Sequence, residues 1–434
     1  MVALQVKDLD KFVDSVERLG FAHPDVVAKF PSRFEYLTRV DQTIDPFSDH
    51  YYSQQVALYE EISNKKLNQV DGELHPVDIK PLLTAPNPLG IPDVGHVSEH
   101  VRALSAMLSI SGLGQNAKVL DMGAGHGLSS EVFAFSGCQV HAVDIDPLLS
   151  QLSIQRSATR HLGITRSTLN FDDLSEIPSR TYQAAYFFQS LHHCLRPWLL
   201  IAALKEKIVA NGVIGFTGEP IQTHWWNNWG IRLDHESLFV ARARGWFESG
   251  WSHQFIRDCF KRSGFKLMFF SGGHAGGEIG IASLSQERLD KIAENAAKIG
   301  HLEVMSERSD GIAPQKYLTQ IGESKETRGY STVPTHNGGY LCYGPYLKLK
   351  PGRYSVALTL MHNEVESSHV IFDLVSESGT KQHFQDRIDV SVRGAAKVYR
   401  EFHIVRETAS VEARVLVVGS GDWYCTMPEI KLLA

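Results

Sequence analysis

The sequence has no long apolar run and no excess of basic residues. No stretch of its 434 residues approaches the roughly 20 consecutive apolar residues of a membrane-spanning helix. The opening MVALQVKDLDKF lacks the basic and apolar regions of a signal peptide. A net charge of -6 and a pI near 6.4 are unlike those of general nucleic-acid-binding proteins. We expect a cytoplasmic protein with no membrane span and no nucleic-acid partner.

Paired cysteines are also missing. The five cysteines are scattered without a CxxC pair, which is typical of reduced, buried thiols rather than of a disulfide framework or a cysteine metal site. They are Cys138, Cys194, Cys259, Cys342 and Cys425.

Two nucleotide-binding motifs are absent where one would look for them, in VLDMGAGHG (residues 119–127). There is no GK[ST] as in a P-loop. A dinucleotide fingerprint would place a glycine at Leu128, one position later than the last glycine here. What is present is a strand end followed by glycines at alternate positions, which lets the backbone approach a ligand closely. The positive end of the next helix points at the same place.

The pattern of the chain predicts four regions. Residues 1–92 form an N-terminal helical or lid region, and residues 93–284 alternate short apolar strands with helices. Residues 285–310 are predicted to be a helical linker, and residues 311–434 an all-β, jelly-roll-like sandwich of period-2 runs. The alternation in the second region predicts a Rossmann-like α/β fold, a parallel sheet with helices on both faces. Its expected strands are 118–123, 139–145, 183–190 and 212–219, and its expected helices 96–110, 127–137, 148–163 and 197–209.

Acidic residues stand near the carboxyl ends of two of these strands and just past a further strand. Asp121 precedes the glycines, and Asp144 ends the next strand, where a carboxylate can accept both hydroxyls of a ribose. Ile145 would lie against an adenine ring, and Asp172 and Asp173 could accept a hydrogen bond from the adenine amino group. So many acids would repel a phosphate ligand but would tolerate a sulfonium cation.

These motifs, VLDMGAGHG, AVDIDP, FDDL and FFQSLHH, resemble the class I S-adenosylmethionine-dependent methyltransferases over roughly residues 95–220. The resemblance implies S-adenosyl-L-methionine as cofactor. It implies that the methionine end of the cofactor faces Asp121 and the turn Gly123, Ala124 and Gly125. It further implies that Asp144 binds the ribose and that Asp172 reaches the adenine.

The segment QSLHHCLRPW looks like the loop of that family that runs beside the cofactor into the acceptor pocket, and it adds Gln189 to the expected cofactor site. His192 or His193 could take a proton from an acceptor hydroxyl, or could pack as a core histidine. Glu219, at the end of a strand, could act as base, orient a hydroxyl or help to hold a metal. The histidines lack a metal-ligand spacing, so we predict no metal.

Residues 218–251 hold five of the seven tryptophans and form the expected acceptor cover. They admit two interpretations, a hydrophobic cover packed on the sheet and a wall that stacks on sugar rings. In the second, Trp229, Arg232, Asp234 and His235 bind the substrate.

The layout also resembles bacterial methyltransferases of surface-polysaccharide biosynthesis, in DHYYSQQVALYEEIS, GEPI, WGIRLDHESL and GWFESGW. The tail GGYLCYGPYLKLKPGRYSV is similar to carbohydrate-binding β-sandwich modules, in which Tyr340, Tyr343 and Tyr346 would be a sugar platform or core residues. We therefore predict methyl transfer to a hydroxyl of a sugar, nucleotide sugar or glycan. The alternatives are a non-sugar small-molecule acceptor and an inert carbohydrate-binding protein, and the sandwich could also make a homo-oligomer contact.

Overall fold

A computed structural model describes most of the chain, and every structural statement below refers to the part that it describes. The tryptophans 225 and 226 of the expected acceptor cover lie outside it. The described residues are 4–21, 26, 34–41, 44–68, 74, 76–221, 229–271, 278–299, 302–305, 317–325, 329–332, 338–363, 368–377, 379–390, 394–419 and 421–433.

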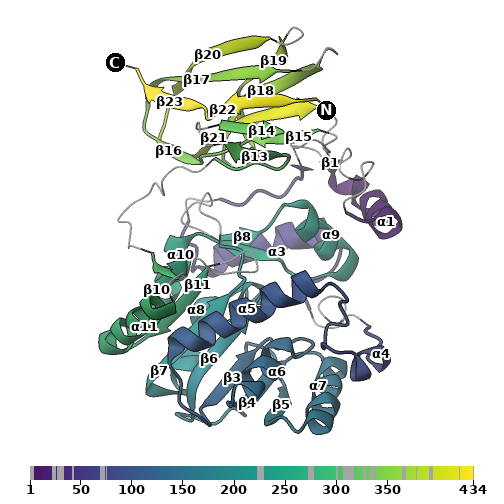
Figure 1. Cartoon of the computed structure of the whole chain (residues 1–434), viewed down its shortest axis with the longest axis vertical. Coiled ribbons are helices and arrows are strands. Elements are labelled where there is room, and N and C mark those ends of the chain that lie inside the picture. The colour runs from purple at the N-terminus through teal and green to yellow at the C-terminus, as the bar shows by residue number, and fades with distance from the viewer. Residues whose placement is uncertain are drawn as a thin grey trace.

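A mixed sheet of eight strands occupies the middle of the chain (Figure 1). Its strands are β3 (Lys118–Met122), β4 (Gln139–Asp144), β5 (Ile164–Thr168), β6 (Tyr182–Phe188), β7 (Ile208–Thr217), β10 (Lys266–Ser271), β11 (Ile279–Ser283) and β12 (Glu303–Val304). Their order is β5-β4-β3-β6-β7-β11-β10-β12, with the first five parallel and β11 antiparallel to both its neighbours. The predicted Rossmann-like sheet is confirmed.

Helices cover both faces of this sheet, because its strands are apolar on both sides. Val119 and Leu120 of β3 point to opposite faces, and both are fully buried. Val119 packs in the cluster that contains Met107 of α5 and Ile292 of α11, and Leu120 in the cluster of α8 and α10. The helices are α5 (Val94–Ser111), α6 (Leu128–Phe135), α7 (Pro147–Arg160), α8 (Pro197–Lys205), α10 (His253–Arg262) and α11 (Gln286–Ile299).

The region expected to be a helical linker is helical over Gln286–Ile299, but it packs in the α/β unit. Helix α11 buries Leu289, Ile292 and Ala296 in a core cluster of the α/β unit. Strand β12 then pairs with β10, so the sheet gains an edge strand from residues 303–304. Residues 285–305, where they are described, thus belong to the α/β unit, and the amphipathic charge pattern of α11 reflects its one solvent face.

The segment before the sheet and the expected acceptor cover pack against each other. Helix α3 (Asp49–Ser63) lies beside α9 (His235–Arg244) and the hairpin of β8 (Trp229–Ile231) and β9 (Ser249–Trp251). Tyr51 donates a hydrogen bond of 2.5 Å to the carbonyl oxygen of Trp229, and Tyr59 one of 2.5 Å to that of Gly245. The remaining N-terminal elements are β1 (Leu4–Gln5), η1 (Val6–Asp8), α1 (Leu9–Leu19), β2 (Phe34–Glu35) and α4 (Lys80–Thr84).

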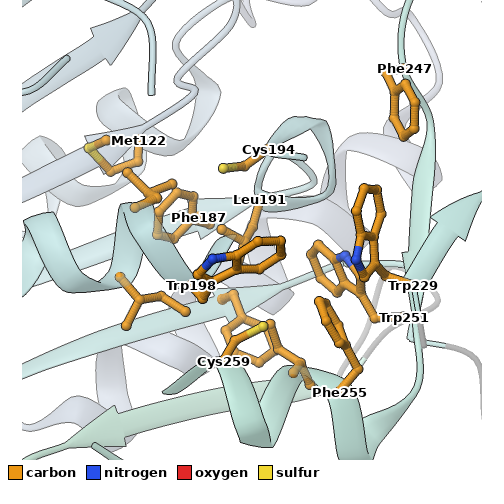
Figure 2. Packing of buried hydrophobic residues seen from close by; sticks show 14 of the residues in the cluster. Met122, Phe187, Leu191, Cys194, Trp198, Trp229, Phe247, Trp251, Phe255 and Cys259 are labelled. Atoms are coloured by element: carbon orange, nitrogen blue, oxygen red, sulfur yellow. The ribbon is translucent and has the colours of Figure 1, made fainter. Parts of the chain in front are cut away.

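Figure 2 shows three aromatic residues of the cover, Trp229, Phe247 and Trp251, in this core together with Trp198 and Phe255. Trp198, Trp229 and Phe255 lie with ring centroids 6.1–6.4 Å apart. Trp229 is 1% exposed and Trp251 is fully buried. This packing is what the hydrophobic-cover interpretation of residues 218–251 predicts.

The C-terminal strands form two antiparallel sheets around their own core, as expected for a sandwich. One sheet has the order β13-β14-β22-β17-β20, with β23 also paired to β17, and the other β15-β21-β18-β19, with β16 also paired to β21. Strand β19 was not predicted, because its sequence KQHFQDRIDV is mostly polar. The strands are β13 (Gly322–Lys325), β14 (Gly329–Thr332), β15 (Gly339–Cys342), β16 (Leu347–Leu349), β17 (Gly352–His362), β18 (Ser368–Ser376), β19 (Lys381–Val390), β20 (Ala395–Ile404), β21 (Thr408–Val418), β22 (Trp423–Thr426) and β23 (Glu429–Leu432).

Two expectations from composition are met within the described residues. All five cysteines are free and buried. No described helix combines the length and the apolar character needed to cross a bilayer.

Candidate functional site

The glycine turn follows β3 directly and requires glycine at Gly123. The backbone φ angles of Gly123, Gly125 and Gly127 are +68°, +50° and +94°, a region that favours glycine. A Cβ at Gly123 would lie 2.6 Å from the Cβ of Ser190. A Cβ at Gly125 would meet no atom within 4 Å, so the turn faces open space there. The turn thus offers a cradle that the chain itself does not fill.

Asp144, at the end of β4, lies beside this turn. Its Oδ2 accepts a hydrogen bond of 2.6 Å from the backbone N–H of Gly125, and its Oδ1 one of 3.0 Å from that of Asp146. Arg166 Nη2 is 3.8 Å from the same Oδ2 and donates to the carbonyl oxygen of Gly125 at 2.8 Å. Ile145 follows at the same edge and is half-buried. The carboxylate is therefore fixed next to the open side of the turn.

Asp121, in β3, is buried between the glycine turn and the first residues of α6. Its Oδ2 accepts hydrogen bonds from Ser129 Oγ at 2.7 Å and Ser130 Oγ at 2.5 Å. Its Oδ1 is buried without a hydrogen-bond partner. Burial raises the pKa of Asp121 to about 6, although the two serines and Arg166 act in the opposite direction. An unpaired buried oxygen beside an open turn suits a ligand that donates a hydrogen bond or carries positive charge.

The other expected cofactor residues lie on exposed loops after β5 and β6. Asp172 and Asp173 are exposed, and their backbone N–H groups both donate to Asn170 Oδ1 at 2.9 Å. Gln189 is exposed too and holds a left-handed backbone with φ of +51°. Its N–H donates to the carbonyl oxygen of Thr217 at 3.1 Å, which anchors the loop to the end of β7.

Glu219, just after β7, organises the loop with the two histidines. Its Oε1 accepts from the N–H groups of Ser190 and Leu191 at 2.9 and 3.0 Å. Its Oε2 accepts from the N–H of His192 at 3.1 Å and lies 2.8 Å from Nδ1 of the same residue. The loop that follows β6, including η3 (Leu191–His193), is therefore built around one buried carboxylate.

A second carboxylate, Glu248, reaches the same histidines from the hairpin of β8 and β9. Its Oε2 lies 3.3 Å from His192 Nε2, and its Oε1 4.0 Å from His193 Nε2. Arg232 Nη1 is 3.7 Å from Glu248 Oε2. We call His192, His193, Glu219 and Glu248 the His–Glu cluster.

Opposite charges in the His–Glu cluster stabilise one another and shift the pKa values of its members. Burial alone would lower the pKa of His192, but Glu219 and Glu248 outweigh it and raise the pKa to about 9. Burial and the neighbouring His192 lower the pKa of His193. Burial opposes ionisation of Glu248, yet the imidazoles and Arg232 lower its pKa to about 2. The pKa of Glu219 is also lowered, because its contacts with His192 and three backbone N–H groups overcome burial.

The glycine turn and the His–Glu cluster are neighbours. Ser190 Oγ donates a hydrogen bond of 2.7 Å to the carbonyl oxygen of Met122, the residue before Gly123. The structure therefore brings together the residues expected at the cofactor with those expected to act on the acceptor, across the adjacent strands β3, β6 and β7.

The four residues expected to bind the acceptor differ in how near they lie to the His–Glu cluster. Trp229 is buried, and its Nε1 donates to the carbonyl oxygen of Pro46 at 2.8 Å. Arg232 pairs with Asp234 at 2.9 Å and also approaches Glu248. Asp234 caps α9 by accepting from Ser237 N, and His235 is exposed, with its ring 5.8 Å from that of Phe21. Arg232 is the one of the four that touches the His–Glu cluster.

Sequence reasoning did not single out several residues of the site. Glu248 belongs to GWFESGW, but its meeting with the histidines depends on the fold of a hairpin 55 residues further along the chain. Arg166, in β5, and the serines of α6 have no motif of their own, and only their contacts with Asp144 and Asp121 reveal them.

Comparison with known proteins agrees with this geometry. Residues 97–268 match the family described as "Methyltransferase domain". A ubiquinone biosynthesis O-methyltransferase of Xanthomonas campestris pv. campestris is 29% identical over 98 residues, which cover 23% of this chain and 41% of that protein. Its counterpart in Xanthomonas oryzae pv. oryzae is 28% identical over 109 residues, 25% of this chain and 44% of that protein. The match thus spans less than half the length of these relatives.

Solved methyltransferase structures are also similar to part of the chain. An S-adenosylmethionine-dependent methyltransferase from Mesorhizobium loti is 18% identical with a TM-score of 0.34, covering 42% of this chain and 95% of that one. One from Aquifex aeolicus is 13% identical with a TM-score of 0.35, covering 48% of this chain and all of that one. The family match over residues 97–268 carries the assignment: they form a class I S-adenosylmethionine-dependent methyltransferase domain.

Proposed function

From the methyltransferase domain in residues 97–268, we propose that the protein transfers a methyl group from S-adenosyl-L-methionine to a hydroxyl of a sugar, nucleotide sugar or glycan. The observation that carries the proposal is the hydrogen bond from Ser190 Oγ to the Met122 carbonyl oxygen, which joins the glycine turn to the His–Glu cluster. A cofactor turn and a set of proton-binding groups therefore lie side by side, as transfer to a hydroxyl requires.

The proposed cofactor site uses the residues around the turn. Asp144 binds the ribose, Ile145 lies at the adenine, and the exposed Asp172, Asp173 and Gln189 complete that end. Asp121 and the turn Gly123, Ala124 and Gly125 face the methionine end. The open space over Gly125 and the unpaired Asp121 Oδ1 support this assignment. When bound, S-adenosylmethionine supplies an electrophilic methyl group and leaves as S-adenosylhomocysteine.

The proposed acceptor side is the His–Glu cluster, which holds the hydroxyl and receives its proton. His193 is the accessible member, since its side chain is 29% exposed whereas that of His192 is 8% exposed. Glu219 positions both histidines through the loop backbone. Of the three residues expected to be catalytic, His193 is thus the one that an acceptor can reach. His192 and Glu219 hold its loop in place through their hydrogen bonds.

A polyhydroxylated acceptor suits the groups around His193. Its ring meets that of Trp246 edge to face with centroids 5.9 Å apart, and Arg232 with Asp234 offers a charged pair nearby. Sugars are bound by such combinations of an aromatic ring with carboxylate and guanidinium groups. We assign Arg232 and Asp234 to the acceptor, and leave Trp229 to the core, where its ring is buried.

The second candidate acceptor is a non-sugar small molecule, which the curated O-methyltransferase relatives favour by their names. The sandwich offers an observation that favours a saccharide ligand. Tyr340, Tyr343 and Tyr346 are half-buried, and Arg414 lies over the Tyr340 ring at 5.3 Å while pairing with Asp373 at 2.6 Å. We propose that this surface binds saccharide, with a contact between copies of the chain as the other possible role.

The test is transfer of a labelled methyl group from S-adenosylmethionine to a panel of nucleotide sugars, free oligosaccharides and simple phenols. We expect a methyl ether on a saccharide, and a His193→Asn protein that is folded but at least about tenfold slower. Labelled phenols with unlabelled saccharides would support the second candidate. Cofactor binding without transfer to any member would contradict the hydroxyl acceptors tested, and saccharide binding without cofactor binding would support an inert protein.

A further inference from the structure

Three members of the His–Glu cluster converge on one point. One ligand atom from each of His192, His193 and Glu248 lies within 4.8 Å of the others. His192 Nε2 is 3.3 Å from Glu248 Oε2, and His193 Nε2 is 4.0 Å from Glu248 Oε1. In a tetrahedral site with bonds of about 2.0–2.1 Å, neighbouring ligand atoms are about 3.3–3.4 Å apart. The first distance matches this spacing, and the second is longer, so His193 and Glu248 must move closer together when a metal ion binds.

Glu219 prepares His192 for such a role from the other side. Its Oε2 accepts from Nδ1 of His192 at 2.8 Å, which keeps a proton on Nδ1. Nε2, which faces Glu248, is then the nitrogen that gives up its proton when a metal ion binds. Glu219 is itself fixed by three backbone N–H groups. A carboxylate that orients the far nitrogen of a histidine in this way is the usual second partner of a metal-ligating histidine.

We propose that His192 Nε2, His193 Nε2 and a Glu248 carboxylate oxygen bind a divalent transition-metal ion of the zinc class. Two imidazole nitrogens and one carboxylate suit zinc and the similar ion cobalt, whereas magnesium prefers oxygen ligands and water. Glu219 and Glu248 provide negative charge around the site. Arg232 does not compete at bonding distance, because its Nη1 is 3.7 Å from Glu248 while its Nε is held by Asp234 at 2.9 Å.

The metal site revises the expectation of no metal, and the reason is topological. Adjacent histidines are not a ligand spacing on a helix or strand, and here they are carried by the short turn η3. Their third partner comes from the hairpin. Three protein ligands leave at least one position open, and, if the proposed function holds, that position receives the acceptor oxygen. His193 would then hold the metal ion instead of taking the proton, and the metal ion would lower the pKa of the acceptor hydroxyl so that its proton passes to solvent. The binding itself does not depend on the proposed function.

Metal content after loading is the direct test. The full chain, stripped with a chelator, is incubated with Zn²⁺, desalted and analysed for bound metal, and Co²⁺ is titrated in parallel to follow its visible absorption. We expect about one ion per chain for the unaltered protein and less than about a tenth of that for His193→Ala and for the near-isosteric Glu248→Gln. A Mg²⁺-loaded sample is expected to retain none.

His253→Ala is the matched control. His253 Nε2 lies 2.5 Å from Glu278 Oε2, a histidine–glutamate pair of the same kind away from the cluster. This variant should bind zinc like the unaltered protein. No stoichiometric zinc in the unaltered chain, or equal zinc in a folded Glu248→Gln protein, would overturn the inference. The zinc assay contains neither cofactor nor acceptor, so its result is independent of the methyl-transfer assay. Bound zinc together with no methyl transfer would refute the proposed function alone. Methyl transfer by a protein that binds no zinc would refute the inference alone.

Discussion

Single residues define the glycine turn, and Gly123 is the most constrained of them. A methyl group there would meet Ser190 Cβ at 2.6 Å, in a segment where the backbone φ is +68°. Gly123→Ala should therefore lower the free energy of unfolding by about 2–4 kcal/mol, from left-handed strain plus overpacking. It should also move the loop that carries the histidines. Urea denaturation measures the first effect.

Gly137→Ala separates the two contributions. Gly137 has a φ of +94°, but a Cβ there meets no atom within 4 Å. This variant should show the strain alone, about 1–2 kcal/mol. Equal losses in the two variants would mean that Ser190 does not press on the turn.

At this scale the sequence was informative wherever contacts are local. Asp121 and the glycines lie within seven consecutive residues, so their pattern could be found without the fold. Glu248 and His193 are 55 positions apart, and no local pattern joins them. The assignment of Trp229 to an acceptor depended on which way a hairpin faces, which its composition does not encode, and the ring packs in the core.

Among the elements, β21 contains a buried acid, Glu412, that makes the free energy of unfolding depend on pH. Burial raises the pKa of Glu412 to about 7, against the attraction of Arg414. The folded-state pKa is above the unfolded one of about 4.3, so the folded chain holds a proton that the unfolded chain loses. Stability should fall by about 3 kcal/mol as the pH rises from about 4.5 to 7, and change little above that on account of this group.

Glu412→Gln should remove that loss and make the protein more stable above pH 7. Thermal or urea unfolding across pH 5–8 measures it. Glu407→Gln is the matched control, since Glu407 is 52% exposed and pairs with Lys348 at the surface. A slope as steep in Glu412→Gln as in the unaltered protein would assign the pH dependence to another group.

The buried cation Arg156 ties helix α7 to its neighbours. Arg156 makes two hydrogen bonds to Glu131 of α6, at 2.6 and 3.0 Å, and two to the carbonyl oxygens of Leu82 and Ala85, at 2.6 and 2.9 Å. Arg156→Met should cost about 3–5 kcal/mol, because it leaves Glu131 without its cation. Arg160→Met, which removes one peripheral bond to Ala85, should cost less than about 1 kcal/mol. Similar denaturation midpoints for both variants would contradict the role of Arg156.

Elements with strong periodicity were predictable, and the weakly patterned ones were not. Helix α1 carries Leu9, Phe12 and Val16 on one face and was found where expected. The edge strand β19 escaped prediction because solvent-facing polar residues interrupt its alternation. The charge-rich composition of α11 predicts a linker, although three of its residues reach the core.

At the scale of the whole molecule, the carboxyl ends of β3, β4, β6 and β7 bring the glycine turn next to the His–Glu cluster. Order along the chain and the four motifs were enough to predict the α/β fold, and the cofactor residues stay a prediction. The acceptor side was not predictable to the same depth, because it is assembled from a loop after β6 and a hairpin of the cover.

Calorimetric titration with S-adenosylmethionine tests the central claim most directly. We predict one binding site per chain, weakened about 10–100-fold in Asp144→Ala by loss of the ribose contact, and unchanged in Glu176→Ala, an exposed acid of a nearby loop. Absence of binding by the unaltered protein at about 1 mM cofactor, or equal affinity in folded Asp144→Ala, would contradict the account.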